Sequence, residues 1–140
     1  MKKILIASDH AGFKLKKQLI PLLEKKFKLN DLGPVNDNSV DYPDLALKLS
    51  KRISKSKNLF GILICGSGMG VAIAANKVKN VRAALCYSTK NTKLSRLHNN
   101  ANIITLGSRL TSKKKAIQLI NLFLSTKFEG GRHLRRIKKI

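Results

Sequence analysis

The chain has 140 residues, 43% of them hydrophobic, and a formal net charge of +22. This length and apolar content match one globular domain over residues 1–140 and exclude a disordered chain. No apolar run reaches membrane-spanning length, and the run ILIA near the start is too short for a signal peptide. We therefore expect a cytoplasmic protein without a membrane partner, in which Cys65 and Cys86 are free thiols.

Hydrophobic spacing predicts strands and helices that alternate along the chain. Short apolar runs predict five strands, over residues 3–7, 29–33, 60–65, 81–86 and 102–107. Helical spacing predicts helices over residues 12–28, 42–53, from about 70, 89–98 and 112–125. A Gly-Gly pair then precedes a short basic helix from about residue 130. This order predicts an α/β fold, a single Rossmann-like domain whose five-stranded parallel sheet carries helices on both faces.

The positive charge comes from 22 lysines and 7 arginines. Nucleic-acid binding is one interpretation of such a balance. The lysines are scattered, however, and neither a zinc-finger spacing nor an aromatic RNA-binding strand accompanies them. We interpret them, with the run Lys113, Lys114 and Lys115, as a solvated surface. A nucleic-acid-binding module stays as an alternative, although it gives the glycine-rich loop no task.

The stretch CGSGMG, residues 65–70, lies between a predicted strand and a predicted helix. Backbone N–H groups in such a loop can hold an anion at the positive end of the helix. The stretch is not a Walker loop, because no Gly-Lys-Ser/Thr follows, and it fits the dinucleotide fingerprint poorly. It therefore predicts a site for a phosphate or oxyanion on a ligand smaller than a nucleotide.

Few side chains near this loop can move a proton, because no carboxylate occurs between Asp44 and Glu129. Within that span the plausible bases are Cys65, Cys86 and His98. Only Cys65 ends a strand directly against the glycine loop, where a helix start and nearby cations favour the reactive thiolate form of a cysteine. We expect Cys86 to be a core residue.

Other polar residues are expected near the same edge of the sheet, where the carboxyl ends of parallel strands meet. Asp9 and His10 follow the first predicted strand, and Arg109 follows the fifth. In the tail, Arg132 and Arg136 are four residues apart, so they share a helix face and suit a phosphate. We expect His133 to be a surface residue of this tail.

Five motifs occur in order along the chain: ASDHAGFKLK, DYPD, CGSGMGVAIAANK, LSRLHNNANIITLGSR and EGGRHLRRI. Together they resemble the sugar-phosphate isomerase family that holds ribose-5-phosphate isomerase type B and the allose-6-phosphate and galactose-6-phosphate isomerases. The resemblance runs from Lys3 to about Ile137. It implies an aldose-ketose isomerase of the pentose phosphate pathway, without metal or cofactor, that interconverts ribose 5-phosphate and ribulose 5-phosphate through a cis-enediolate. A hexose-6-phosphate isomerase and a non-catalytic sugar-phosphate sensor stay as alternatives.

The resemblance also implies roles for individual residues. Cys65 is the implied base that moves the proton between C1 and C2, and His98 is the implied acid that opens the furanose ring. The implied enediolate-binding loop comprises Gly66, Ser67, Gly68, Met69 and Gly70. The other implied substrate contacts are Asp9, His10, Tyr42, Asn99, Arg109, Arg132 and Arg136. The family further implies a homodimer or a dimer of dimers, in which the His98 region of one subunit faces Cys65 of the other.

Overall fold

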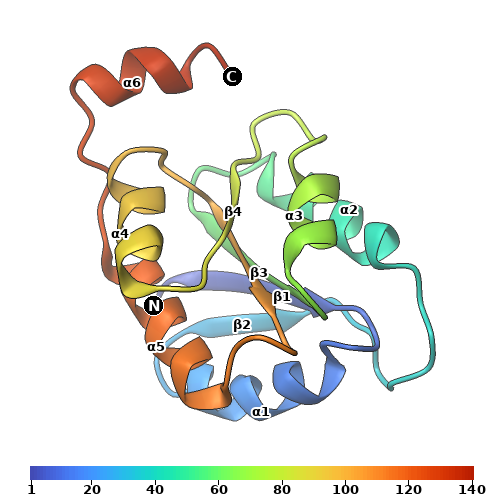
Figure 1. The fold of residues 1–140 in the computed structure, drawn as a ribbon. Coiled ribbons are helices and arrows are strands. Elements are labelled where there is room, and N and C mark those ends of the chain that lie inside the picture. Colours follow the sequence, from blue (N-terminus) through green and yellow to red (C-terminus); the bar gives the residue numbers. More distant parts are fainter.

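Five parallel strands form the centre of the structure, in the order β2-β1-β3-β5-β4 (Figure 1). The computed structural model describes residues 1–140. The strands are β1 (Lys3–Ser8), β2 (Lys28–Asp31), β3 (Leu59–Cys65), β4 (Ala83–Leu85) and β5 (Ile103–Gly107). The predicted α/β fold with a five-stranded parallel sheet is confirmed. The predicted strand over residues 81–86 is shorter, in part because the Arg82 N–H donates to the side chain of Asn102.

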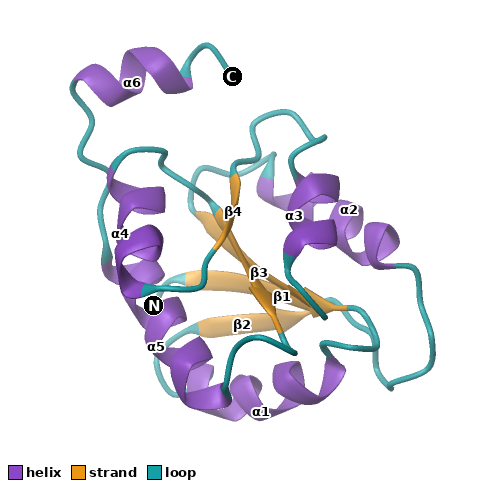
Figure 2. Cartoon of the chain, viewed as in Figure 1, coloured by secondary structure: helices purple, strands orange, loops and turns teal.

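Helices lie on both faces of this sheet (Figure 2). They are α1 (Phe13–Leu23), α2 (Tyr42–Ile53), α3 (Met69–Ala75), α4 (Thr89–Leu97), α5 (Lys113–Ser125) and α6 (Arg132–Ile137). The first helix ends at Leu23 rather than near residue 28, because a turn over residues 24–26 leads straight into β2. No helix in the structure has both the length and the apolar character needed to cross a membrane.

The central strands β1, β3 and β5 are apolar on both sides, and this produces two separate cores. Ile4 and Ile6 of β1 face a core that includes Leu19 of α1 and Phe123 of α5. The alternate residues of β1 join a second core with side chains of α2 and α3. Cys86 lies in the first core, as the sequence predicts, and burial raises the pKa of its thiol. Burial on both faces therefore fixes the sheet between two helical layers.

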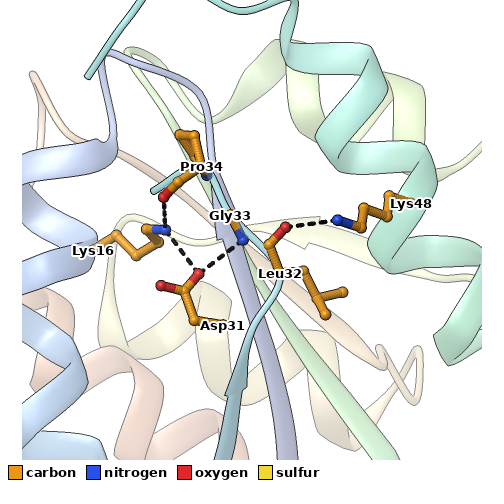
Figure 3. Close-up of polar contacts among 6 residues, drawn as sticks. All are labelled: Lys16, Asp31, Leu32, Gly33, Pro34 and Lys48. Atoms are coloured by element: carbon orange, nitrogen blue, oxygen red, sulfur yellow. Dashed lines mark hydrogen bonds and ion pairs between the residues drawn. The ribbon is translucent and has the colours of Figure 1, made fainter. Parts of the chain in front are cut away.

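A lysine is fully buried between α1 and the loop that follows β2 (Figure 3). The Lys16 Nζ donates to the Asp31 carboxylate at 2.7 Å and to the Pro34 carbonyl at 2.7 Å. The same carboxylate oxygen accepts the N–H of Gly33 at 2.9 Å. Because the Gly33 carbonyl in turn accepts the N–H of Ser8 at 3.1 Å, this contact ties the loop to the end of β1.

A second lysine holds the same loop from the other face of the sheet. The Nζ of Lys48, on α2, donates to the carbonyl of Leu32 at 3.1 Å (Figure 3). The Leu32 N–H donates to the Ile6 carbonyl at 2.8 Å. The loop is therefore fixed by one lysine from each helical layer, directly beside the residues that follow β1.

We predict that Asp31→Asn destabilises the fold by about 3 kcal/mol, because it leaves the buried Lys16 ammonium without its counter-charge. For a chain of this size that loss corresponds to a melting temperature lower by about 10 °C. Asp37→Asn is the matched control, since Asp37 is exposed in the following loop and makes no ion pair. Thermal unfolding of both variants measures the difference, and equal melting temperatures would contradict the role given to Lys16.

Candidate active site

The glycine loop begins where β3 ends, at Cys65. The Cys65 Sγ accepts the N–H of Gly68 at 3.1 Å, so the loop folds back over the sulfur. Gly68 has a positive φ of 77°, and a Cβ there would lie 2.7 Å from Leu85 and 2.8 Å from the Leu106 backbone. Only glycine fits this turn without strain. The buried Thr105 hydroxyl, on β5, donates to the Gly68 carbonyl at 2.8 Å and fixes the loop from beneath.

The two backbone N–H groups directly after Cys65 have no acceptor within the chain. They belong to Gly66 and Ser67. The next two N–H groups have local acceptors, since that of Gly68 donates to the Cys65 Sγ and that of Met69 donates to the Ser67 Oγ at 3.2 Å. Unpartnered N–H groups beside a cysteine sulfur are the donors that an oxyanion would require. The loop can therefore hold a negatively charged oxygen next to a potential base.

Two large side chains lie directly on the glycine loop. A Cβ on Gly70 would be 2.5 Å from the ring of Tyr42, and a Cβ on Gly66 would be 2.6 Å from the guanidinium of Arg109. Glycine at these positions therefore lets the phenol and the guanidinium approach the loop backbone. The backbone supports the same placement, because the Arg109 N–H donates to the Gly66 carbonyl at 3.0 Å.

Asp9 and His10 follow β1 at the same edge of the sheet. The mostly buried Asp9 accepts the Gly12 N–H at 2.9 Å, and its own N–H donates to the Ile64 carbonyl at 3.1 Å. The His10 Nδ1 accepts the Val40 N–H at 3.2 Å, which leaves the Nε2 as the hydrogen-bearing nitrogen of the neutral ring. These contacts place a carboxylate and an imidazole beside the end of β3.

The carboxyl edge of the sheet thus gathers most of the predicted site residues. They are Asp9, His10, Tyr42, Cys65, Gly66, Ser67, Gly68, Met69, Gly70 and Arg109. Thr105 was not predicted, because a threonine inside a buried strand has no distinct sequence signal. Its role appears only when β5 is seen beside β3.

Four predicted site residues lie at the opposite edge of the sheet: His98, Asn99, Arg132 and Arg136. Helix α4 starts after β4 and runs back, so His98 at its end lies before the start of β5. Asn102, four residues on, accepts the N–H of Gly61 near the start of β3. Figure 1 shows α6 on the side away from the arrowheads of β1, β3 and β5. One chain therefore does not bring His98 and Cys65 together.

The side chain of His98 contacts α6 and the segment that leads into it. Its ring stacks on His133 with centroids 4.2 Å apart, and its Nε2 lies 3.7 Å from the Glu129 carboxylate. The expectation that His133 is a surface residue is wrong, because the stacking leaves it only 8% exposed. Burial lowers the pKa of His133, and the charges of His98, Arg132 and Arg136 add to this effect.

The same three side chains bring their potential ligand atoms within 4.8 Å of one another. Imidazole binds a metal in its ring plane, and the rings of His98 and His133 are only 14° from parallel. Their lone pairs therefore run side by side instead of converging on one point. Two cationic neighbours, Arg132 and Arg136, also disfavour a metal ion here. The arrangement does not fit a metal centre.

Two cavities, of about 600 and 940 Å³, lie at the amino edge of the sheet, away from Cys65. The smaller one is lined in part by Arg82 and Arg96. The Arg82 Nε donates to the Asn100 carbonyl at 3.0 Å, and Arg96 donates to the carbonyls of Ala101 and Thr126. Burial lowers the pKa of both guanidinium groups, but each is held by backbone carbonyls. These arginines stabilise the loops around β5.

The sequence model of the Ribose/Galactose Isomerase family matches residues 4–140. The chain belongs to this family. A probable ribose-5-phosphate isomerase B of Mycoplasma genitalium is 49% identical, with 98% of this chain and 92% of the relative covered. The solved ribose 5-phosphate isomerase of Thermotoga maritima is 47% identical, with a TM-score of 0.95 and 99% and 96% of the chains covered.

A further solved structure is ribose-5-phosphate isomerase B of Mycoplasma genitalium with bound ribulose-5-phosphate. It is 48% identical to this chain, has a TM-score of 0.92 and covers 98% of this chain and 92% of its own. The family resemblance inferred from the five sequence motifs is therefore confirmed over nearly the whole isomerase chain.

Thr105→Val should lower the isomerase turnover number about tenfold or more, because the glycine loop beside Cys65 would lose its support and shift. The change also leaves the Gly68 carbonyl buried without a donor, at a cost of about 1–3 kcal/mol in stability. Thr105→Ser is the matched control, since it keeps the hydroxyl. Steady-state kinetics below the melting temperature test this, and full turnover in the valine variant would show that the loop does not depend on Thr105.

Proposed function

We propose that this protein interconverts ribose 5-phosphate and ribulose 5-phosphate. The observation that supports this most strongly is the end of β3, where the Cys65 sulfur lies beside the unpartnered N–H groups of Gly66 and Ser67. A base next to preorganised oxyanion donors is what proton transfer beside a carbonyl requires. A 48% identical relative was solved with bound ribulose-5-phosphate, which indicates the substrate class.

In the proposed reaction the Cys65 thiolate removes the proton from C2 of open-chain ribose 5-phosphate. The N–H groups of Gly66 and Ser67 donate to the oxygens of the resulting cis-enediolate. The thiol returns the proton to C1, and the proton of O2 passes to O1, which completes the ketose with no net gain or loss of protons. A positioned base contributes about 10²–10⁴ in rate and an oxyanion donor about 10²–10³. The reaction consumes no redox equivalent and needs no cofactor.

The remaining residues bind the substrate in this proposal. Arg132 and Arg136 lie one turn apart on α6 and clamp the phosphate, together with Arg109. Guanidinium groups suit this task because they donate paired hydrogen bonds to phosphate oxygens. The other assigned contacts are Asp9 and His10 with the sugar, Asn99 with its hydroxyls, and Tyr42, Gly68, Met69 and Gly70 along the pocket wall.

We further propose that the active unit is a homodimer, alone or paired into a dimer of dimers. Cys65 and His98 lie at opposite edges of the sheet, and strands of five to seven residues separate those edges by about 15–20 Å. One sugar phosphate cannot touch both within one chain. In a two-fold dimer, His98, Asn99 and the α6 arginines of each subunit can face the glycine loop of its partner. Exposed Met69 and Ile73 of α3 and Leu134 of α6 provide apolar surface for such contacts.

A hexose-6-phosphate isomerase is the alternative within the same family, whose description covers both ribose and galactose isomerases. Rates on ribose 5-phosphate and allose 6-phosphate, compared under the same conditions, distinguish the two. We place the enzyme in the cytoplasm, because the proposed chemistry needs Cys65 as a reduced thiol and both cysteines are free.

Cys65→Ala should reduce isomerisation by at least 10²-fold, because it removes the base while the loop N–H groups remain. Binding of ribulose 5-phosphate, measured by calorimetry, should stay close to that of the unmodified enzyme. Cys86→Ala is the matched control, since it removes the other cysteine from the core and should retain turnover below its melting temperature. Near-normal turnover of Cys65→Ala would eliminate Cys65 as the base.

A further inference from the structure

The EGGRH motif folds so that two of its side chains meet His98. The Glu129 N–H donates to the Leu97 carbonyl at 3.1 Å, which fixes Glu129 beside the end of α4. Gly130 and Gly131 then adopt positive φ angles of 73° and 55°, which side chains other than glycine rarely adopt. This turn brings His133 back onto His98. The motif therefore constructs a cluster of one carboxylate and two imidazoles.

The two stacked imidazoles cannot both be protonated without strong repulsion. Their ring centroids are 4.2 Å apart, and two positive charges at that distance repel each other strongly unless water fully screens them. Groups that interact so closely titrate as a pair. As the pH falls, the pair therefore takes up one proton well before a second, and the surroundings decide which ring carries the first.

The surroundings of the two rings are different. His133 is 8% exposed, and its pKa is lowered by burial first, then by the charge of His98 and by Arg132 and Arg136, against the opposing effect of the Glu129 carboxylate. The side chain of His98 is 41% exposed, and its Nε2 lies 3.7 Å from the Glu129 carboxylate. Glu129 is the last of the seven acidic residues and the only one beyond Asp44. The carboxylate attracts a proton to either ring, so the burial of His133 and the arginines beside it are what favour the proton on the more exposed His98.

We propose that Glu129 and His133 are positioning residues that keep the proton of the histidine pair on His98. His133 stays neutral and presents a flat ring that orients His98, while Glu129 balances the imidazolium charge. The inference rests on the proposed role of His98 as the acid that opens the furanose ring. It gives the EGGRH motif a task besides the phosphate contact of Arg132.

The charge test uses Glu129→Gln, which removes the carboxylate but keeps the shape of an exposed side chain. Because the acid must be protonated, kcat/KM for cyclic ribose 5-phosphate should fall on the alkaline side of the pH profile. We expect the alkaline limb to move to lower pH, so the loss reaches about tenfold near pH 8 and is smaller near pH 6. Glu24→Gln is the matched control, because it makes the same change in net charge at an exposed position directly after α1.

The substrate provides a second control. Ribulose 5-phosphate has no furanose ring to open, so its kcat/KM in Glu129→Gln should stay within about twofold of the unmodified enzyme. An unshifted profile, or an equal loss on both substrates, would overturn the positioning role of Glu129.

His133 is tested with a charged and an uncharged replacement. His133→Lys places a permanent positive charge against His98 and should lower the rate on ribose 5-phosphate at least tenfold more than His133→Gln does. Equal losses in the two variants would show that His133 has a packing role only.

Histidine NMR titration of the free enzyme separates this inference from the proposed function. As the pH falls, we expect the first proton of the pair to appear on His98 and not on His133, and Glu129→Gln to weaken proton uptake by the pair. Protonation of His133 first would overturn the inference even if catalysis proceeds as proposed. If instead His98→Asn leaves the rate on ribose 5-phosphate unchanged, His98 does not open the ring. The titration of the unmodified enzyme still shows which of the two histidines carries the proton.

Discussion

The parallel direction of all five strands is the constraint on which the rest of the structure depends. It brings the carboxyl ends of all the strands to one edge of the sheet, so Cys65, Asp9 and Arg109 meet although they are far apart in the sequence. The helices that connect parallel strands must run from the carboxyl edge back to the amino edge. His98, at the end of α4, therefore lies far from Cys65. A shared site between two subunits follows from this division if both residues act on one substrate.

The contacts at the carboxyl edge show how buried polar groups support a site without touching a ligand. Thr105 holds the Gly68 carbonyl, and Lys16 holds the loop beside β1 through Asp31. The chain has only two ion pairs for a net charge of +22, so most lysines are solvated and contribute little to the fold. Stability comes mainly from the two apolar cores, and the few buried polar contacts fix the loops.

Much of this architecture could be predicted from the sequence. Apolar runs such as that of Ile4–Ile6 mark strands, and the glycines after Cys65 mark the loop. Lys16, Thr105 and His133 could not be assigned, because each acts through a partner that is distant in the sequence: Asp31, the Gly68 carbonyl and His98. When a lysine or histidine stands among many charged residues, the local sequence is that of a solvent-exposed segment, so its burial cannot be predicted. Only the packing of α1 on the sheet, of β5 beside β3 and of α6 against α4 reveals these partners.

The central claim is that Cys65 of one subunit and His98 of the other act on one substrate. Mixing Cys65→Ala with His98→Asn, after dissociation and reassociation, tests it most directly with ribose 5-phosphate as substrate. If the subunits pair at random, half of the dimers are mixed and each has one intact site, so about a quarter of the unmodified activity should return. Activity that stays at the average of the two separate variants would contradict a shared site and place both residues in one chain's own site.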